Sequence, residues 1–152
     1  GISTPFIVRW PSNIKSAKNV HQPLHITDIP ATCIAAAGAT YPSHRPDNDI
    51  TPLEGESFLD LLNGRDWKRE TPMFWEHEGN RGMREGDWKL LLNPRDHNRP
   101  SNREPGGKLF LANVTEDPGE SRNLAKSKPE VVDRLKILRD QFVQDLKRSK
   151  GK

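Results

Sequence analysis

Residues 73–92 constrain the fold of this chain more strongly than any other stretch. The segments Met73–Glu76 and Trp88–Leu92 are largely apolar, and the part between them is charged and contains three glycines. Glycine accommodates the positive φ angles of tight turns, and short apolar runs bounded by turn residues are typical of strands. With Arg81–Met83 lying between two turns, this stretch predicts an antiparallel meander.

The C-terminal residues predict a further strand and a long helix. Leu109–Leu111 is a short apolar run that follows a loop expected over residues 93–107. Ser127 and Glu130 have the spacing of a capping box, with Pro129 inside the first turn, so a helix is expected over residues 128–148. The apolar residues that recur at helical spacing are Val131, Leu135, Leu138, Phe142 and Leu146.

The N-terminal part predicts a strand followed by a helix. Phe6–Trp10 is apolar, lies between two prolines and indicates a buried strand. His25–Gly38 carries helix signals: Thr27 or Asp28 can cap it, Pro30 fits its first turn, and its last glycine ends it. Asp28 is therefore interpreted as a helix cap and not as a catalytic acid.

A loop, a short helix and a charged linker follow. Residues 40–56 are rich in proline and aspartate and predict a loop, and Ser57–Gly64 predicts a short helix. We place a boundary between residues 1–70 and residues 71–152, in the charged linker.

Hydrophobic residues are only 32% of the chain. This share suits a peripheral subdomain that packs against a partner, and a loop-rich independent domain is the alternative.

Composition excludes several classes of function. The 24 basic and 21 acidic residues are interleaved, so the net charge of +3 forms no nucleic-acid-binding block. No apolar run reaches the roughly 18 residues of a membrane span. The single cysteine, Cys33, excludes an internal disulfide, and we expect it to be a small buried residue. Residues without the spacing of metal ligands are Asp47, Asn48, Asp49, His21, His25, His44 and His97.

Several segments resemble, in the same order, the C-terminal region of type I sulfatases, the arylsulfatase family. They are Gly1–Pro11, Thr27–Thr32, Leu59–Gly64, Phe74–Leu92, and Leu109–Leu111 with Asp117–Glu120 and Asn123–Ala125. The resemblance implies an α+β fold. Residues 1–70 would end an alkaline-phosphatase-like α/β domain, and residues 71–152 would form a small antiparallel sheet packed with a C-terminal helix. It also implies that the complete enzyme hydrolyses sulfate esters.

The resemblance further implies that the catalytic residues lie upstream of Gly1. In the family, the nucleophile is a formylglycine made within a Cys/Ser-x-Pro-Ser-Arg motif, and aspartates and an asparagine hold calcium or magnesium. Neither pattern occurs here, so no catalytic residue or metal ligand is assigned and the isolated chain is expected to be inactive. The implied partners are the N-terminal part of the same enzyme and a sulfated small molecule or glycan. The implied location is periplasmic, secreted or lysosomal.

His77, Asn80 and Arg81 are the candidate substrate-binding residues. In sulfatases this edge of the small sheet faces the substrate entrance, so the resemblance implies contact with the organic part of the substrate. The alternative is that His77 and Asn80 satisfy turn hydrogen bonds while Arg81 pairs with a carboxylate. Trp75 and Trp88 are expected to pack in the sheet core, with carbohydrate stacking as the alternative.

Two other functions stay open on the sequence alone. One is a non-catalytic module that binds sulfated glycans on the same fold. The other is part of a related phosphatase or phosphonate hydrolase. Catalytic residues upstream of Gly1 would favour the enzyme, and glycan binding by the isolated chain would favour the module.

Overall fold

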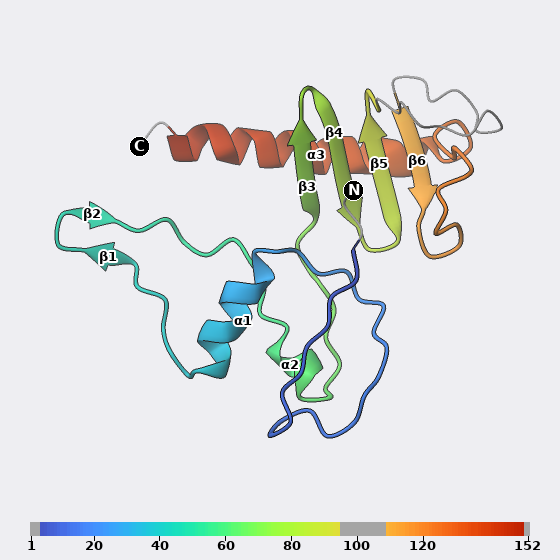
Figure 1. Ribbon diagram of the computed structural model, residues 1–152. Coiled ribbons are helices and arrows are strands. Elements are labelled where there is room, and N and C mark those ends of the chain that lie inside the picture. The colour runs from blue at the N-terminus through green and yellow to red at the C-terminus, as the bar shows by residue number, and fades with distance from the viewer. Residues whose placement is uncertain (1–3, 95–108, 151–152) are drawn as a thin grey trace. The chain divides into compact units, whose positions relative to one another are not determined.

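The computed structural model describes residues 4–94 and 109–150, with the side chains of the last helix described to residue 148. The chain forms two compact units, Gly1–Glu70 and Thr71–Lys152 (Figure 1). These are the N-terminal unit and the C-terminal unit. Most of the loop predicted over residues 93–107 lies outside the described residues, as does His97.

The described residues of the N-terminal unit form short helices and a small hairpin. The elements are α1 (Asp28–Ala36), β1 (His44–Arg45), β2 (Asn48–Asp49) and α2 (Leu59–Leu62), with β1 and β2 antiparallel. Pro30 lies in the first turn of α1, where its missing N–H leaves no bond unmade. Gly38 and Gly64 follow the helices with φ angles of +61° and +79°. The two predicted helices are therefore confirmed.

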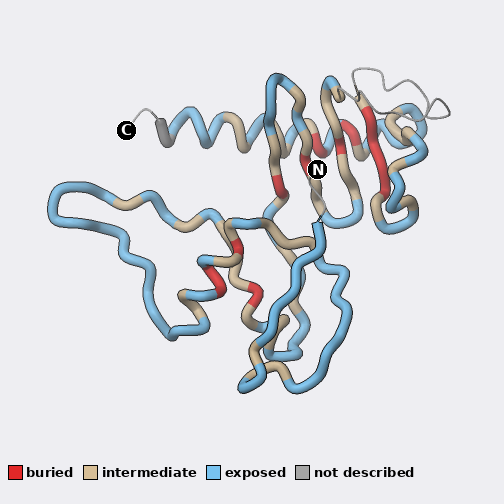
Figure 2. Tube along the Cα trace, viewed as in Figure 1, coloured by how far each residue is buried: buried red, intermediate tan, exposed pale blue. Residues whose placement is uncertain are grey.

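The strand predicted over Phe6–Trp10 is wrong for the described residues, because this segment has no regular secondary structure and is mostly exposed (Figure 2). A strand exists only where backbone N–H and C=O groups find a ladder partner, and no described segment supplies one. Phe6 instead packs edge-on against Phe58, with ring centroids 6.0 Å apart. Phe58 also contacts Trp67 at 6.4 Å and is itself buried.

Two further expectations for the N-terminal unit are wrong. Cys33 is exposed, because α1 buries the face formed by Asp28, Ala31 and Thr32, and Cys33 lies outside it. The segment 40–56 is not wholly irregular, because β1 and β2 form a two-stranded hairpin within it. Both strands are exposed, so this hairpin has no buried apolar residues of the kind that signal a strand in the sequence.

The C-terminal unit contains a four-stranded antiparallel sheet in chain order. Its strands are β3 (Met73–His77), β4 (Asn80–Glu85), β5 (Trp88–Leu92) and β6 (Leu109–Asn113). The predicted meander and the predicted strand at Leu109 are confirmed. The last element is α3 (Pro129–Lys150), which crosses the strands on one face of the sheet (Figure 1).

The core of the C-terminal unit lies between this face and α3. Met83, Leu90 and Leu111 come from three adjacent strands, and Val132 and Leu135 come from the helix. Leu135 is fully buried, and burying one such side chain stabilises a fold by about 1.5–3 kcal/mol. The amphipathic pattern of the helix therefore predicts its packing face correctly for most of its length.

The far end of α3 leaves the sheet. Phe142 stacks on Phe74 of β3, with ring centroids 4.0 Å apart and planes within 5°. Beyond this contact the helix extends past β3 (Figure 1), and Leu146 is exposed. The apolar stripe thus packs on the sheet as far as Phe142, whereas Leu146, which continues the stripe at helical spacing, is exposed.

Ser127 does not cap α3 as its spacing predicts. Its hydroxyl donates to the carbonyl of Leu124 at 3.1 Å, within the turn that precedes the helix. The backbone carbonyl of Lys128 accepts the first bonds, from Val131 and Val132. The helix therefore begins one residue later than a Ser127 cap requires, because the preceding turn uses the serine hydroxyl.

Asp117 organises the turn between β6 and α3. Its carboxylate accepts hydrogen bonds from the backbone N–H groups of Ser121 and Arg122, at 2.7 and 2.9 Å. The bond from Arg122 is the largest cause that lowers the pKa of Asp117 below its ordinary value of 3.8, and the bonds from Ser121 add to it. The ionised form is thus favoured in the folded state.

A depressed pKa links this turn to acid stability. The folded state binds fewer protons than the unfolded state, so Asp117 contributes stability above its unfolded pKa, and this is lost as pH falls through the folded pKa. We expect Asp117→Asn to flatten the dependence of the unfolding free energy on pH in the acid range, from about pH 5 downward, and to leave it unchanged near neutral pH. Urea unfolding at several pH values measures this. Equal pH dependence in both proteins would contradict the assignment.

Candidate functional site

The turn between β3 and β4 places two of the three predicted site residues side by side. Its central residues, Glu78 and Gly79, have φ angles of +49° and +77°, as a type I′ hairpin turn requires. His77 and Asn80 form the last cross-strand pair. The amide Nδ2 of Asn80 donates to the backbone oxygen of His77 at 3.1 Å. The turn thus fixes both residues at one end of the sheet.

The register of the sheet separates Arg81 from His77 and Asn80. Cross-strand partners share a face, and faces alternate along each strand. Glu76 pairs with Arg81, two positions from Phe74, whose ring stacks on α3, so Arg81 lies on the helix-facing side. His77 and Asn80 lie on the opposite side. The three residues predicted together therefore divide between the two faces.

Arg81 forms an ion pair with Glu76. Its Nε lies 3.0 Å from Oε2, and the two side chains are 47% and 57% exposed. Such an exposed pair contributes about 0–1 kcal/mol, so its effect is mainly to hold the guanidinium at the side of the turn. These contacts are those of the turn alternative. Substrate contact by His77, Asn80 and Arg81 stays a prediction.

The two tryptophans of the sheet have different surroundings. Trp88 lies on the helix-facing side and packs against the core, as predicted. Trp75 lies on the other face, with His77 and Asn80, and is partly exposed. A Cβ at its cross-strand partner Gly82 would lie 3.6 Å from Cε3 of Trp75 and 3.3 Å from Cδ2 of Leu91. Gly82 thus leaves room for both side chains against β4.

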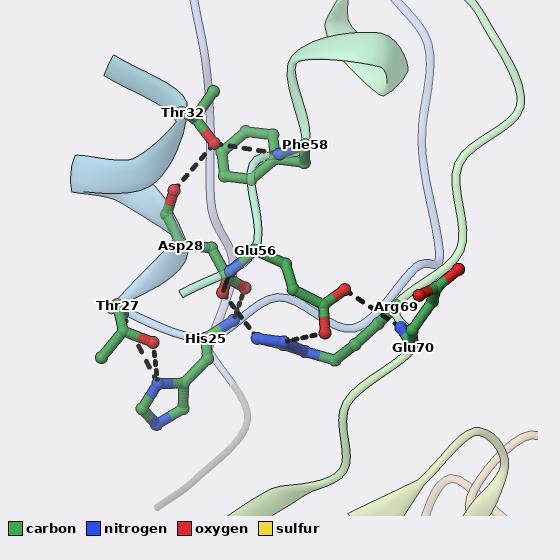
Figure 3. A network of polar contacts seen from close by, with 8 residues as sticks. All are labelled: His25, Thr27, Asp28, Thr32, Glu56, Phe58, Arg69 and Glu70. Carbon is green, nitrogen blue, oxygen red and sulfur yellow. Dashed lines mark hydrogen bonds and ion pairs between the residues drawn. The ribbon is translucent and has the colours of Figure 1, made fainter. Parts of the chain in front are cut away.

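A buried polar network in the N-terminal unit escaped the sequence reasoning (Figure 3). The side chain of Asp28 is fully buried, and it accepts bonds from Arg69 at 2.6 Å and from the backbone N–H groups of Glu56 and His25 at 2.9 and 2.6 Å. Asp28 is therefore not the helix cap that its position predicts. No spacing in the sequence joins it to residues 28 and 41 positions away.

The Asp28 network (Asp28, Glu56 and Arg69) joins separate segments of the N-terminal unit. Glu56 lies 3.6 Å from Arg69 and accepts the backbone N–H of Glu70 at 3.0 Å. Nearby, the Thr32 hydroxyl donates to the carbonyl of Asp28 at 2.7 Å and accepts from the N–H of Phe58 at 3.0 Å (Figure 3). These contacts join residues from three separate segments of the unit, so we interpret the network as structural.

No group of three or more His, Cys, Asp or Glu residues in the described part of the chain could hold a metal ion. Asp47–Asp49 belongs to the exposed β1–β2 hairpin, where Asp49 pairs with His44 at 3.0 Å. The donor set found in residues 4–94 and 109–150 therefore does not fit a metal centre. Within those ranges, no helix has the length and apolar character to cross a membrane.

Known proteins similar to this chain are sulfatases. No protein-family model matches it. It is 27% identical over 138 residues to an uncharacterized sulfatase of Schizosaccharomyces pombe, covering 89% of this chain and 24% of that protein. It is 36% identical over 66 residues to an ulvan-active sulfatase of Formosa agariphila, covering 43% of this chain and 12% of that protein. The chain thus spans at most about a quarter of these relatives, in their C-terminal part.

Solved structures show the same fold. A Bacteroides thetaiotaomicron protein from work on the metabolism of multiple glycosaminoglycans has a TM-score of 0.51 and 23% identity, over 76% of this chain and 24% of that chain. A sulfatase candidate from the same bacterium has a TM-score of 0.53 and 21% identity, over 78% and 24%. At these identities the likeness concerns the fold alone. The predicted fold class, mixed α and β with a small antiparallel sheet and a C-terminal helix, is confirmed.

Proposed function

This chain corresponds, in sequence and in fold, to the C-terminal portion of sulfatases, and on that premise we propose that it is part of an enzyme that hydrolyses sulfate esters. The observation that carries the proposal is the match to a sulfatase over 89% of the chain. The activity belongs to the complete enzyme, because the match spans only 24% of that relative. Sulfate release by the complete protein is the test.

The contribution of this chain is to complete the fold and to form one wall of the substrate pocket. His77 and Asn80 support this role because a rigid hairpin holds them side by side, and the His77 side chain is exposed. An imidazole and an amide both donate and accept hydrogen bonds, which suits the hydroxyl groups of an organic substrate. Arg81 pairs with Glu76 on the helix-facing side of the sheet and so stabilises the β3–β4 turn.

The nucleophile and the metal belong to the N-terminal part of the same enzyme in this proposal. The similarity to sulfatases leads us to expect a formylglycine nucleophile and calcium or magnesium there. When bound, such a metal stabilises the negative charge that develops on oxygen during ester cleavage. The residues of this chain bind and orient the organic group of the sulfate ester.

We expect His77→Ala in the complete protein to raise the KM for its sulfate ester by about fivefold and to change kcat by less than about twofold. Loss of one hydrogen bond costs about 1 kcal/mol, and binding made equally in ground and transition states appears in KM. Steady-state kinetics measure both constants. His44→Ala is the matched control, since His44 is also exposed and lies on the β1–β2 hairpin. Unchanged KM for His77→Ala would sink the assignment.

A further inference from the structure

The two edges of the four-stranded sheet, β3 and β6, differ in what covers them (Figure 1). At the β6 edge, the N–H of Leu111 donates to Oδ1 of Asn123 at 3.1 Å, and its C=O accepts the N–H of Leu124 at 2.8 Å. Nδ2 of Asn123 also donates to the C=O of Leu109 at 3.0 Å. The segment after β6 therefore pairs with the outer backbone groups of this edge strand.

The β3 edge has no such cover among the described residues. A two-residue hairpin turn closes with a pair that exchanges both hydrogen bonds, here His77 with Asn80, and the bonding direction then alternates along the strand. Phe74 and Glu76 consequently direct their N–H and C=O groups away from β4. No hydrogen bond within residues 4–94 and 109–150 reaches these groups. Together they present two donors and two acceptors to a further strand.

β3 also lacks the features that usually keep an open sheet edge from pairing with another strand. Such edges commonly carry a proline, a lysine or a bulge. β3 contains neither proline nor lysine, and its register with β4 is unbroken from Met73 to His77. The carboxylate of Glu76 is paired with Arg81. The edge strand is therefore suited to accept another strand.

The helix α3 extends beyond β3 and provides apolar cover there. Phe142 stacks on Phe74 of β3, with ring centroids 4.0 Å apart. Leu146 follows four residues later, roughly 6 Å further along the helix axis, and adjacent strands lie roughly 4.8 Å apart. Since α3 crosses the strands and continues past β3 (Figure 1), the side chain of Leu146, which is 38% exposed, lies at the level of a strand added beside β3.

We propose that β3 pairs with a fifth strand, contributed by the part of the complete protein that lies outside this chain. The match to the sulfatase relative covers 24% of that protein, so about three quarters of such a protein can supply the strand. The fifth strand places an apolar side chain beside Phe74, under α3, and a polar one beside Glu76. This pairing requires only that the chain is part of a longer protein, so it stands whether or not that protein releases sulfate.

A second copy of this chain fits the edge less well. Antiparallel pairing of two β3 strands uses all the outer groups of both only when Trp75 lies on the two-fold axis. That register sets Phe74 of one copy opposite Glu76 of the other, on the helix-facing side. An aromatic ring opposite a carboxylate is a poorer cross-strand pair than two apolar side chains or two opposite charges.

Hydrogen–deuterium exchange of the complete protein, resolved by mass spectrometry with electron-transfer fragmentation, tests the fifth strand. The amides of Phe74 and Glu76 are expected to exchange as slowly as the amide of Trp75, which bonds to β4, to within about tenfold. An open edge makes them exchange more than about a hundredfold faster than Trp75. That result would overturn the proposal.

Two substitutions of Glu76 separate the backbone from the side chain. Glu76→Pro removes an N–H that β4 does not use, so an open edge tolerates it. With a fifth strand, it should raise the exchange rate of the Phe74 amide by at least about tenfold, because a strand hydrogen bond is lost and the proline ring meets the added strand. Glu76→Ala removes only the ion pair with Arg81 and should change that rate by less than about threefold.

The amide of Trp75 reports whether the sheet stays folded in both variants, since it bonds to β4 and should keep its slow exchange. Equal exchange rates of the Phe74 amide in Glu76→Pro and Glu76→Ala would overturn the proposal. Dilution with light scattering identifies the source of the strand. Protection that is unchanged on dilution supports a strand from within the complete protein, whereas protection that is lost as a dimer dissociates would overturn it in favour of a second copy.

Discussion

Asp28→Asn is expected to lower the free energy of unfolding by about 3–5 kcal/mol. The carboxylate is fully buried and accepts bonds from Arg69 and from two backbone N–H groups. Asparagine has nearly the same shape, but it removes the charge that pairs with Arg69, whose side chain is only 7% exposed. The asparagine also places a donor NH₂ group where the carboxylate oxygens accepted hydrogen bonds from other donors. A buried cation and an unmatched amide then remain, and both are costly.

Urea unfolding monitored by circular dichroism measures this loss. Asp60→Asn is the matched control, because Asp60 also pairs with an arginine, Arg65, at 2.9 Å, but with side chains 53% and 71% exposed. Its removal should cost less than about 1 kcal/mol. If Asp28→Asn stays within the range of Asp60→Asn, the Asp28 network does not hold the N-terminal unit together.

Gly55→Ala is expected to destabilise the protein by about 3 kcal/mol, at the upper end for overpacking. A Cβ at this position would lie 1.9 Å from the carbonyl oxygen of Thr27 and 2.8 Å from the backbone nitrogen of Asp28. Both are backbone atoms, so the chain itself must move. That movement also pulls the N–H of Glu56 away from the Asp28 carboxylate, which it now meets at 2.9 Å.

Gly119→Ala is the control, since the nearest atom to its added Cβ lies 3.7 Å away, at ordinary contact distance. Its unfolding free energy should stay within about 0.5 kcal/mol of the wild type. Because Gly55 and Asp28 act through the same hydrogen bond, the double mutant should lose less than the sum of the single losses. Full additivity, or a Gly55→Ala protein as stable as the Gly119→Ala protein, would contradict the close backbone approach.

Elements defined by local signals could be predicted from the sequence. The glycine turns and apolar runs of residues 73–92 specify the meander, because turn chemistry and burial act over a few residues. The stripe from Val131 to Phe142 specifies the packing face of α3 in the same way. Ser127 shows the limit of local rules, since a neighbouring turn uses its hydroxyl before the helix can.

Features that depend on distant partners could not be predicted. Asp28 pairs with Arg69, which lies 41 residues further along the chain. An acidic residue at the start of a helix and an arginine in a charged linker are both common, so neither position signals the pair in the sequence. Phe6–Trp10 has the composition of a strand, but a strand also needs a hydrogen-bonded neighbour. For the candidate site, the resemblance to sulfatases grouped Arg81 with His77 and Asn80. The two-residue turn fixes a register that puts them on opposite faces, because a shift of one residue reverses every side chain.

The most direct measurement of the central claim is sulfate release by the complete protein that carries this chain. Ion chromatography would measure the sulfate released from 4-nitrocatechol sulfate and from methyl β-galactopyranoside 6-sulfate. Mass spectrometry would verify the formylglycine, and calcium or magnesium would be supplied. We predict one sulfate released for each ester cleaved, and none with the 152-residue chain alone. A complete protein with verified formylglycine that releases no sulfate, or that cleaves only the matching phosphate esters, would contradict the account.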